Sequence, residues 1–288
     1  MIVAASPSLR QIVREVWRPL ALLFCWDCAV AVLYDVVPWR APSLPLPLFG
    51  SALALFLGFR VNAAYARWWE ARVLWGAIIN TARSLSRVTR AWLPPDIART
   101  IVRRQIGWAH ALRGQLRRAA PDADGLRFVP ADDPARARTN VANALLDATG
   151  VEVAAARATG RIDSVQQAAI ETLLVDAANA QGGCERLKNT PLPIQYRFLP
   201  TIFTQGFCVL LPIGLVETLG YATPLGSTVA GLMFLAVLRV GDDLADPFAG
   251  DVHDVPLSAM CRTIEIDLLQ GLGEEAPGPL GPVKGVLW

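Results

Sequence analysis

Residues 44–76 read LPLPLFGSALALFLGFRVNAAYARWWEARVLWG, and this stretch decides the fold. Its first half is apolar, and its second half continues at helical spacing with arginine and tryptophan side chains. A helix needs about 20 apolar residues to cross the hydrocarbon core of a bilayer. The stretch therefore predicts a membrane helix over about residues 44–75 that leaves the lipid near its tryptophans.

Three further apolar stretches predict membrane helices over about residues 19–37, 199–219 and 222–239. Only a few residues around Gly220 separate the last two, so we expect an antiparallel pair joined by a tight turn. The whole chain is 53% hydrophobic and 18% charged, whereas soluble domains carry roughly 25% charged residues. This composition excludes a disordered chain and argues against a soluble enzyme. The net charge of +2 is too small to indicate nucleic-acid binding.

The distribution of arginines predicts the orientation in the membrane. Arg10, Arg14 and Arg18 precede the first predicted helix, six arginines from Arg60 to Arg90 follow the apolar half of the second, and the turn near Tyr221 has none. Because basic residues are enriched on the cytoplasmic side, both termini and the middle of the chain are expected in the cytoplasm. The expected location is the cytoplasmic (inner) membrane.

The middle and the end of the chain, about residues 80–198 and 240–288, predict a cytosolic helical region. Amphipathic segments alternate there with prolines and glycines, and none shows the alternation of a strand. One segment has Asp163 or Ser164 as its predicted N-cap and the Gly182–Gly183 pair as its predicted stop. The predicted fold class is an all-α membrane protein with four transmembrane helices in two pairs and a cytosolic helical domain.

Motifs of common enzymes are missing from the sequence. It has no phosphate-binding GxxxxGK[ST] loop, no GxGxxG and no HExxH, and it contains only two histidines. Cys25 and Cys28 form a CxxC, but they lie in an apolar helix without the βαβ context of a redox site. We interpret them as small residues on one helix face, with a membrane redox enzyme as a rival interpretation.

Two carboxylates interrupt the first predicted membrane helix. Acidic residues within a membrane are costly and usually face a partner or water. Asp27 and Asp35 are therefore candidates for an ion pathway. The alternative is that they reach the interface or pair with an arginine of another helix.

A stripe of three residues marks one face of the second predicted helix. Ser51, Leu55 and Phe59 follow i, i+4, i+8 spacing. In a symmetric assembly the stripe would form stacked, mostly apolar rings, which can gate a pore by dewetting. An apolar stripe also commonly packs against another helix, and the spacing alone leaves both interpretations open.

Two stretches resemble signatures of the bestrophin family. Residues 56–72 (FLGFRVNAAYARWWEAR) contain a Gly-Phe pair followed at the family's distance by Arg-Trp-Trp, and residues 246–254 (DPFAGDVHD) resemble the family's Asn-Pro-Phe-Gly motif. The resemblance covers about residues 8–270. It implies one bestrophin-like domain over residues 1–288 and a homopentamer around one central pore, of the bacterial type.

The resemblance also assigns roles to residues. It places the pore neck on Ser51, Leu55 and Phe59, and a second constriction at the cytosolic exit on Leu192. A calcium clasp of animal members would fall on Asp251 and Asp254, with Asp243 nearby. Calcium prefers six to eight oxygens, and the acidic run is thinned here, so an acidic turn that caps the helix near Pro256 is the alternative. No cofactor is expected to be required.

The arginine and tryptophans of the first signature have a structural interpretation. They lie where the second membrane helix leaves the lipid, where tryptophan commonly anchors at the interface. We expect Arg67 to pair with a carboxylate, either Glu70 or one from another helix, rather than to contact ions.

The resemblance implies a passive channel for small monovalent ions with a hydrophobic neck gate. The bacterial branch favours sodium or potassium slightly over chloride, although uncharged rings do not choose a sign. The alternatives are an anion channel of the same fold and a non-channel membrane scaffold. The expected partners are other copies of the chain, membrane lipid and monovalent ions, with no nucleic acid.

Overall fold

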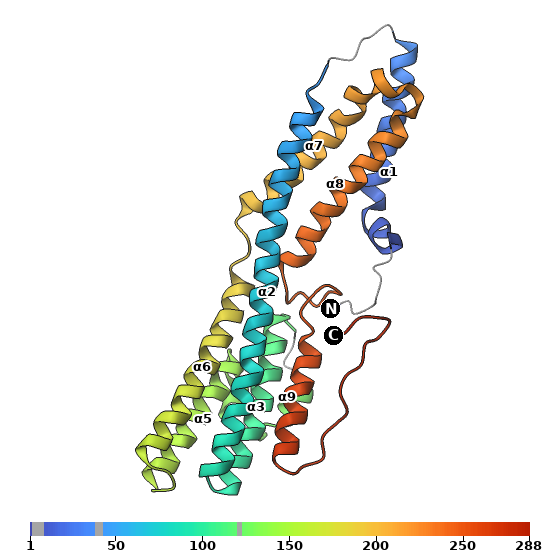
Figure 1. The fold of residues 1–288 in the computed structure, drawn as a ribbon. Coiled ribbons are helices and arrows are strands. Elements are labelled where there is room, and N and C mark those ends of the chain that lie inside the picture. The colour runs from blue at the N-terminus through green and yellow to red at the C-terminus, as the bar shows by residue number, and fades with distance from the viewer. Residues whose placement is uncertain (2–8, 38–42, 120–122) are drawn as a thin grey trace. The chain divides into compact units, whose positions relative to one another are not determined.

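The computed structural model describes residues 1, 9–37, 43–119 and 123–288. Within these ranges the regular secondary structure is helical, apart from one isolated bridge between Val283 and Val286 (Figure 1). The helices are α1 (Leu9–Val36), α2 (Leu46–Trp92), α3 (Pro95–Leu116), α4 (Ala123–Leu126), η1 (Pro134–Ala137), α5 (Val141–Ala158), α6 (Ser164–Asn189), α7 (Ile194–Leu219), η2 (Gly220–Ala222), α8 (Thr223–Ala245) and α9 (Leu257–Gly271).

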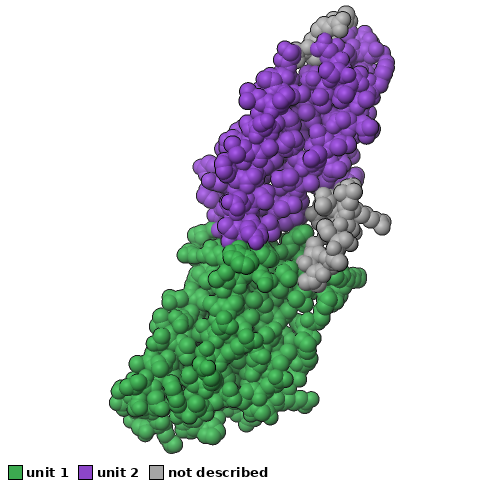
Figure 2. Space-filling model, in the orientation of Figure 1, with its two compact units in different colours: residues 1–3, 68–190, 247–288 green, residues 4–67, 191–246 purple. Residues whose placement is uncertain are grey.

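The chain packs as two compact units (Figure 2). Unit 1 comprises residues 1–3, 68–190 and 247–288, and unit 2 comprises residues 4–67 and 191–246. Helix α2 contributes to both units, so neither is a continuous piece of sequence. The assignment of residues 1–288 to one family domain stays a prediction.

Unit 2 contains the predicted membrane helices. Helix α8 packs against both α1 and α7 (Figure 1), and η2 forms the predicted tight turn between α7 and α8. Leu53 and Leu57 of α2 share a small apolar core with Phe207 of α7. In the described part of the chain, three segments are long and apolar enough to cross a membrane: Val16–Val36, Leu46–Trp92 and Ile194–Ala245. The last segment contains both α7 and α8, which agrees with four predicted membrane helices.

Several helices extend beyond the predicted membrane spans. Helix α1 begins at Leu9 and keeps Pro19 in its interior, whereas the prediction began at Pro19. Helix α8 continues to Ala245, beyond the predicted end at 239. Helix α2 continues to Trp92 instead of ending near 75, because its amphipathic second half buries side chains such as Trp75 and Ile78 in the core of unit 1.

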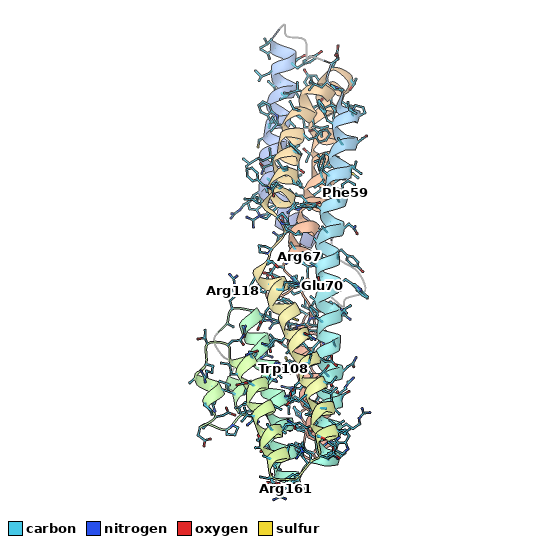
Figure 3. All side chains as sticks on the ribbon, turned by 90° about the vertical axis from the view of Figure 1, so that its left-hand side faces the viewer. Phe59, Arg67, Glu70, Trp108, Arg118 and Arg161 are labelled. Atoms are coloured by element: carbon cyan, nitrogen blue, oxygen red, sulfur yellow. The ribbon has the colours of Figure 1, made fainter. Side chains whose placement is uncertain are left out.

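Unit 1 is a helical bundle with one apolar core. Helix α3 packs against α5, α6 and α9, and Trp108 of α3, labelled in Figure 3, is fully buried. Its indole Nε1 donates a hydrogen bond of 2.7 Å to Oε1 of Gln181 in α6. A buried indole N–H is costly unless it finds such a partner, so this bond fixes how α3 and α6 pack.

Helix α6 confirms one predicted end and overturns the other. Asp163 is the N-cap and forms a capping box with Gln166. The Gly182–Gly183 pair does not end the helix, which continues to Asn189. A Cβ on Gly183 would lie 2.7 Å from Cδ2 of Leu74 in α2. This glycine therefore permits close packing of two helices, and it does not act as a C-cap.

One of the two histidines is part of the core of unit 1. His110 is buried, and its Nε2 lies 3.6 Å from a carboxylate oxygen of Glu265. Burial lowers the pKa of His110 to about 4, against the opposing effect of Glu265. The imidazole is therefore neutral near pH 7, where it packs against the ring of Phe128.

Candidate functional site

The predicted neck residues lie on the outward face of α2. Helix α2 buries Leu53, Leu57 and Ala64, whereas 60% of Leu55 and 58% of Phe59 are exposed. Figure 3 shows Phe59 at the outer side of the helix. At 100° per residue the stripe stands opposite the buried face, and it extends about 12 Å along the helix axis. The structure thus brings Ser51, Leu55 and Phe59 together on a surface that the protomer itself does not cover.

The residues around the stripe have small, uncharged side chains. The Ser51 hydroxyl donates a hydrogen bond of 2.7 Å to the carbonyl oxygen of Pro47, one turn earlier. A Cβ on Gly58 would meet nothing within 4 Å, so a neighbouring molecule has room beside Phe59. Asn62 and Ala66 continue the same exposed face toward the end of unit 2. This face of α2 therefore carries no charge from Ser51 to Ala66.

An ion pair that no sequence pattern predicted lies on the buried side of α2, next to the predicted neck residues. Arg60 follows Phe59 but points the opposite way: its side chain is 2% exposed, and Nη2 pairs with Oδ1 of Asp242 in α8. Asp242 is 41% exposed. Because Arg60 is almost completely buried, removal of its partner Asp242 would leave an uncompensated charge and lower the stability of the protein. The only sequence signal was an arginine at a helix position that otherwise carries buried apolar residues.

The two signature stretches meet in space through hydrogen bonds to backbone carbonyl groups. Nε of Arg67 donates a hydrogen bond of 3.0 Å to the carbonyl oxygen of Ala245, at the end of α8. The indole Nε1 of Trp68 donates one of 3.0 Å to the carbonyl oxygen of His253. The expected partner of Arg67, Glu70, pairs with Arg186 of α6. Thus the Arg-Trp-Trp motif orders the segment that contains the second signature.

The two acidic residues of α1 have separate partners. Asp27 is fully buried and accepts hydrogen bonds of 3.0 Å from the hydroxyls of Ser227 and Thr228 in α8. Asp35 is exposed and accepts a hydrogen bond of 2.6 Å from the hydroxyl of Tyr221. Hydroxyl groups therefore donate hydrogen bonds to both carboxylates. The predicted alternative to an ion pathway was a pair with an arginine of another helix. The structure brings neither of them to the face of α2 that carries the neck stripe.

The residues predicted for the cytosolic aperture and for calcium lie in different settings. Leu192 is half-buried in the connection between α6 and α7. Asp243 pairs with Arg239 at 3.0 Å, one turn earlier in α8. Asp251 is exposed, and Asp254 is buried.

The buried carboxylate closes its own turn. Oδ2 of Asp254 accepts hydrogen bonds from the backbone N–H of Gly250 at 2.5 Å and of Asp251 at 3.0 Å. Gly250 has a φ of +96°, a conformation that favours glycine. Asp254 therefore orders residues 250–254, whereas no side chain caps α9, which starts after Pro256.

These contacts do not fit a calcium shell. Two of the three predicted ligands, Asp243 and Asp254, are already engaged by hydrogen-bond donors. Among the residues that the structure describes, no group of three or more His, Cys, Asp or Glu side chains is arranged to hold a metal ion. We therefore derive no function from calcium.

Comparison with known proteins identifies the family. The sequence profile described as "Bacterial/Fungal Bestrophin protein" matches residues 6–270. The chain belongs to the bestrophin family. This confirms the resemblance seen in the two signatures, and it makes the chain a membrane protein of a channel family rather than an enzyme.

Named bestrophin relatives cover nearly the whole chain. A voltage-dependent anion channel-forming protein of Mesorhizobium japonicum is 33% identical over 99% of this chain and 96% of its own length. The voltage-dependent anion channel-forming protein YneE of Escherichia coli is 36% identical over 90% of this chain and 87% of its own length. The crystal structure of a bacterial bestrophin homologue from Klebsiella pneumoniae matches with a TM-score of 0.86 and 34% identity, covering 90% of this chain and 99% of that one. The predicted all-helical bestrophin fold is confirmed.

Proposed function

We propose that this bestrophin assembles as a homopentamer around one central pore and conducts small monovalent ions passively. The observation that carries this proposal is the stripe of Ser51, Leu55 and Phe59, which faces away from the protomer on an uncharged helix face. Family membership supports a channel, and five-fold symmetry would turn the stripe into three stacked rings. Leu192 is the proposed ring of a second constriction at the cytosolic exit.

The rings of Leu55 and Phe59 form the proposed gate of the pore. Both side chains are large, apolar and exposed in the protomer. A narrow apolar ring excludes water and thereby stops ions without needing a charged plug. The ring of Ser51 is smaller and polar, so it forms the wetter mouth of the same neck.

The charges near the outer end of the membrane helices favour cations. Asp35 of α1 and Glu217 of α7 are both exposed in that part of unit 2. Arg40 is the one basic residue between residues 19 and 59, and it lies outside the described residues. Carboxylates on the outer surface around a pore raise the local concentration of cations there without lining the pore themselves. We therefore propose sodium or potassium as the permeant ions.

Chloride is the second candidate, on one specific observation. The relatives from M. japonicum and E. coli both carry the name of anion channel-forming proteins. The proposed neck has no charge and accepts either sign, so the names and the outer carboxylates point in opposite directions.

The proposed location is the cytoplasmic membrane, with both termini in the cytoplasm. The arginines before the first membrane helix and after the second support this orientation. Membrane lipid is then the proposed partner of exposed apolar side chains of unit 2, such as Leu22 and Val32 of α1.

A reversal potential tests both conduction and ion choice. Purified protein with the mass of five chains is placed in a planar bilayer under a sodium chloride gradient. We expect currents that reverse near the sodium equilibrium potential. Reversal near the chloride equilibrium potential would favour the second candidate and contradict the cation proposal. Absence of current from a verified pentamer would contradict the channel and favour a non-channel membrane scaffold.

A further inference from the structure

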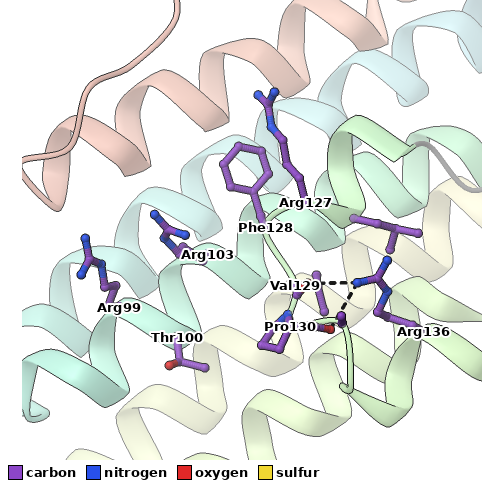
Figure 4. Close-up of a pocket in the computed structure, with 10 residues that line it drawn as sticks. Arg99, Thr100, Arg103, Arg127, Phe128, Val129, Pro130 and Arg136 are labelled. Atoms are coloured by element: carbon purple, nitrogen blue, oxygen red, sulfur yellow. Dashed lines mark hydrogen bonds between the residues drawn. The ribbon is translucent and has the colours of Figure 1, made fainter.

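A large cavity in unit 1 has no role in the proposed pore. It measures about 850 Å³, within the range of about 300–1,000 Å³ typical of small-molecule sites. Its wall comes from α3, from the connection after α4, and from η1 (Figure 4). Leu126, Val129 and Pro130 contribute apolar surface, and four arginines contribute charge: Arg99, Arg103, Arg127 and Arg136.

Among the described residues, the arginines of this cavity outnumber the carboxylates that pair with them. Glu274 pairs with Arg99 at 2.6 Å and with Arg103 at 2.7 Å, so one carboxylate binds two guanidinium groups. Arg127 pairs with the buried Glu265 at 2.5 Å. No acidic residue is among those lining the cavity. In the described part of the chain, two carboxylates therefore pair with three of the four arginines.

Two of the arginines have unused hydrogen-bonding capacity. Among the described residues, Nη1 of Arg136 donates only to the carbonyl oxygens of Val129 and Pro130, at 3.3 and 3.4 Å (dashed lines in Figure 4). Nε of Arg103 is shielded from water and has no acceptor among the described residues. A donor left without an acceptor in such a place is costly, and a bound anion that draws the guanidinium toward itself would relieve the cost.

We propose that this cavity binds an organic phosphate that carries at least two negative charges. Guanidinium groups bind phosphate oxygens in pairs, with better geometry than an ammonium group. The apolar wall from Leu126 to Pro130 would receive the organic part of the ligand. The site is assigned by its own residues and does not depend on whether the chain conducts ions.

Glu274 acts as an internal competitor for this ligand. Its carboxylate occupies Arg99 and Arg103, and the hydrogen bond from Arg103 is the main reason that the pKa of Glu274 is lowered. The side chain is therefore ionised near pH 7 and withdraws two guanidinium groups from the ligand. Removing its charge is expected to strengthen binding, which distinguishes a ligand site from a purely structural arginine cluster.

Calorimetric titration of the full-length protein in detergent tests the proposal. The probes are ADP without divalent metal, and pyrophosphate, which carries similar charge without the organic part. We expect ADP to bind, Glu274→Gln to tighten its binding about tenfold, and Arg136→Gln to weaken it about tenfold. The matched control is Glu275→Gln, which removes the same charge from the exposed neighbouring residue and should leave the affinity unchanged.

Three results would overturn the proposal. The first is no binding of ADP to either the wild-type protein or Glu274→Gln. The second is equal tightening by Glu274→Gln and Glu275→Gln, which would show a general effect of net charge. The third is equal affinity for pyrophosphate and ADP, which would show that the organic part of the ligand contributes nothing to binding.

Discussion

Replacing Phe59 by alanine is expected to raise the single-channel conductance several-fold. The side chain is 58% exposed in the protomer and would form the innermost apolar ring of the proposed neck. Five-fold symmetry multiplies the change, because five phenyl rings leave the constriction together. The wider and wetter neck would also spend less time closed. Single-channel recording in planar bilayers measures both quantities.

The control for this variant is Phe56→Ala. Phe56 lies on the same helix with 48% exposure, but its ring packs edge-on against Phe203 of α7, with the centroids 5.8 Å apart. It points away from the neck stripe, so its removal should leave the conductance unchanged. Unaltered currents in Phe59→Ala, Leu55→Ala and the double variant would show that these residues do not line the pore.

Replacing Asp242 by asparagine is expected to destabilise the protein by about 3 kcal/mol. The change leaves the guanidinium of Arg60 buried without its counter-charge, and Arg60 is only 2% exposed. Loss of one partner of a buried pair is far more costly than loss of both. The thermal midpoint of the detergent-solubilised protein reports the effect.

A surface ion pair supplies the control. Asp267→Asn removes the same charge from the pair of Asp267 in α9 with Arg83 in α2, whose side chains are 32% and 49% exposed. Surface pairs of this kind contribute roughly 0–1 kcal/mol, so the midpoint should hardly move. A double variant, Arg60→Met with Asp242→Asn, should recover part of the loss. Equal midpoints for Asp242→Asn and Asp267→Asn would contradict the role given to Arg60.

The membrane helices were predictable because their apolar stretches have the length of a bilayer core. The ends of the helices were harder to predict, because the tendency of proline and glycine to end a helix depends on which residues of other helices pack against them. Pro19 stays inside α1, and Gly183 stays inside α6, where it lets Leu74 approach. Helix α2 passes its predicted end because unit 1 covers its second half.

The neck stripe was visible in the sequence, whereas the ion pairs and hydrogen bonds around it were not. Helical spacing alone puts Ser51, Leu55 and Phe59 on one face. Arg60 and Arg67 find partners 182 and 178 residues away, and no local pattern encodes such a separation. The same reason hid the cavity of unit 1, whose arginines come from three separate segments.

The most direct test of the proposed pore is chemical modification of a cysteine placed on the stripe. In Ser51→Cys, a cationic methanethiosulfonate reagent added to the outer solution would attach to the proposed outer ring of the neck. The matched variant is Ala52→Cys, the exposed neighbouring residue, which lies against Phe203 and Phe207 in a groove beside α7. The wild-type protein, with its five native cysteines, gives the background.

We expect modification to block the current of Ser51→Cys and to leave the currents of Ala52→Cys and the wild-type protein unchanged. A pentamer carries five such thiols around one axis, so labelling only some of the five is expected to block the current. A current through Ser51→Cys that persists after complete labelling, verified by mass, would contradict a pore lined by this face of α2.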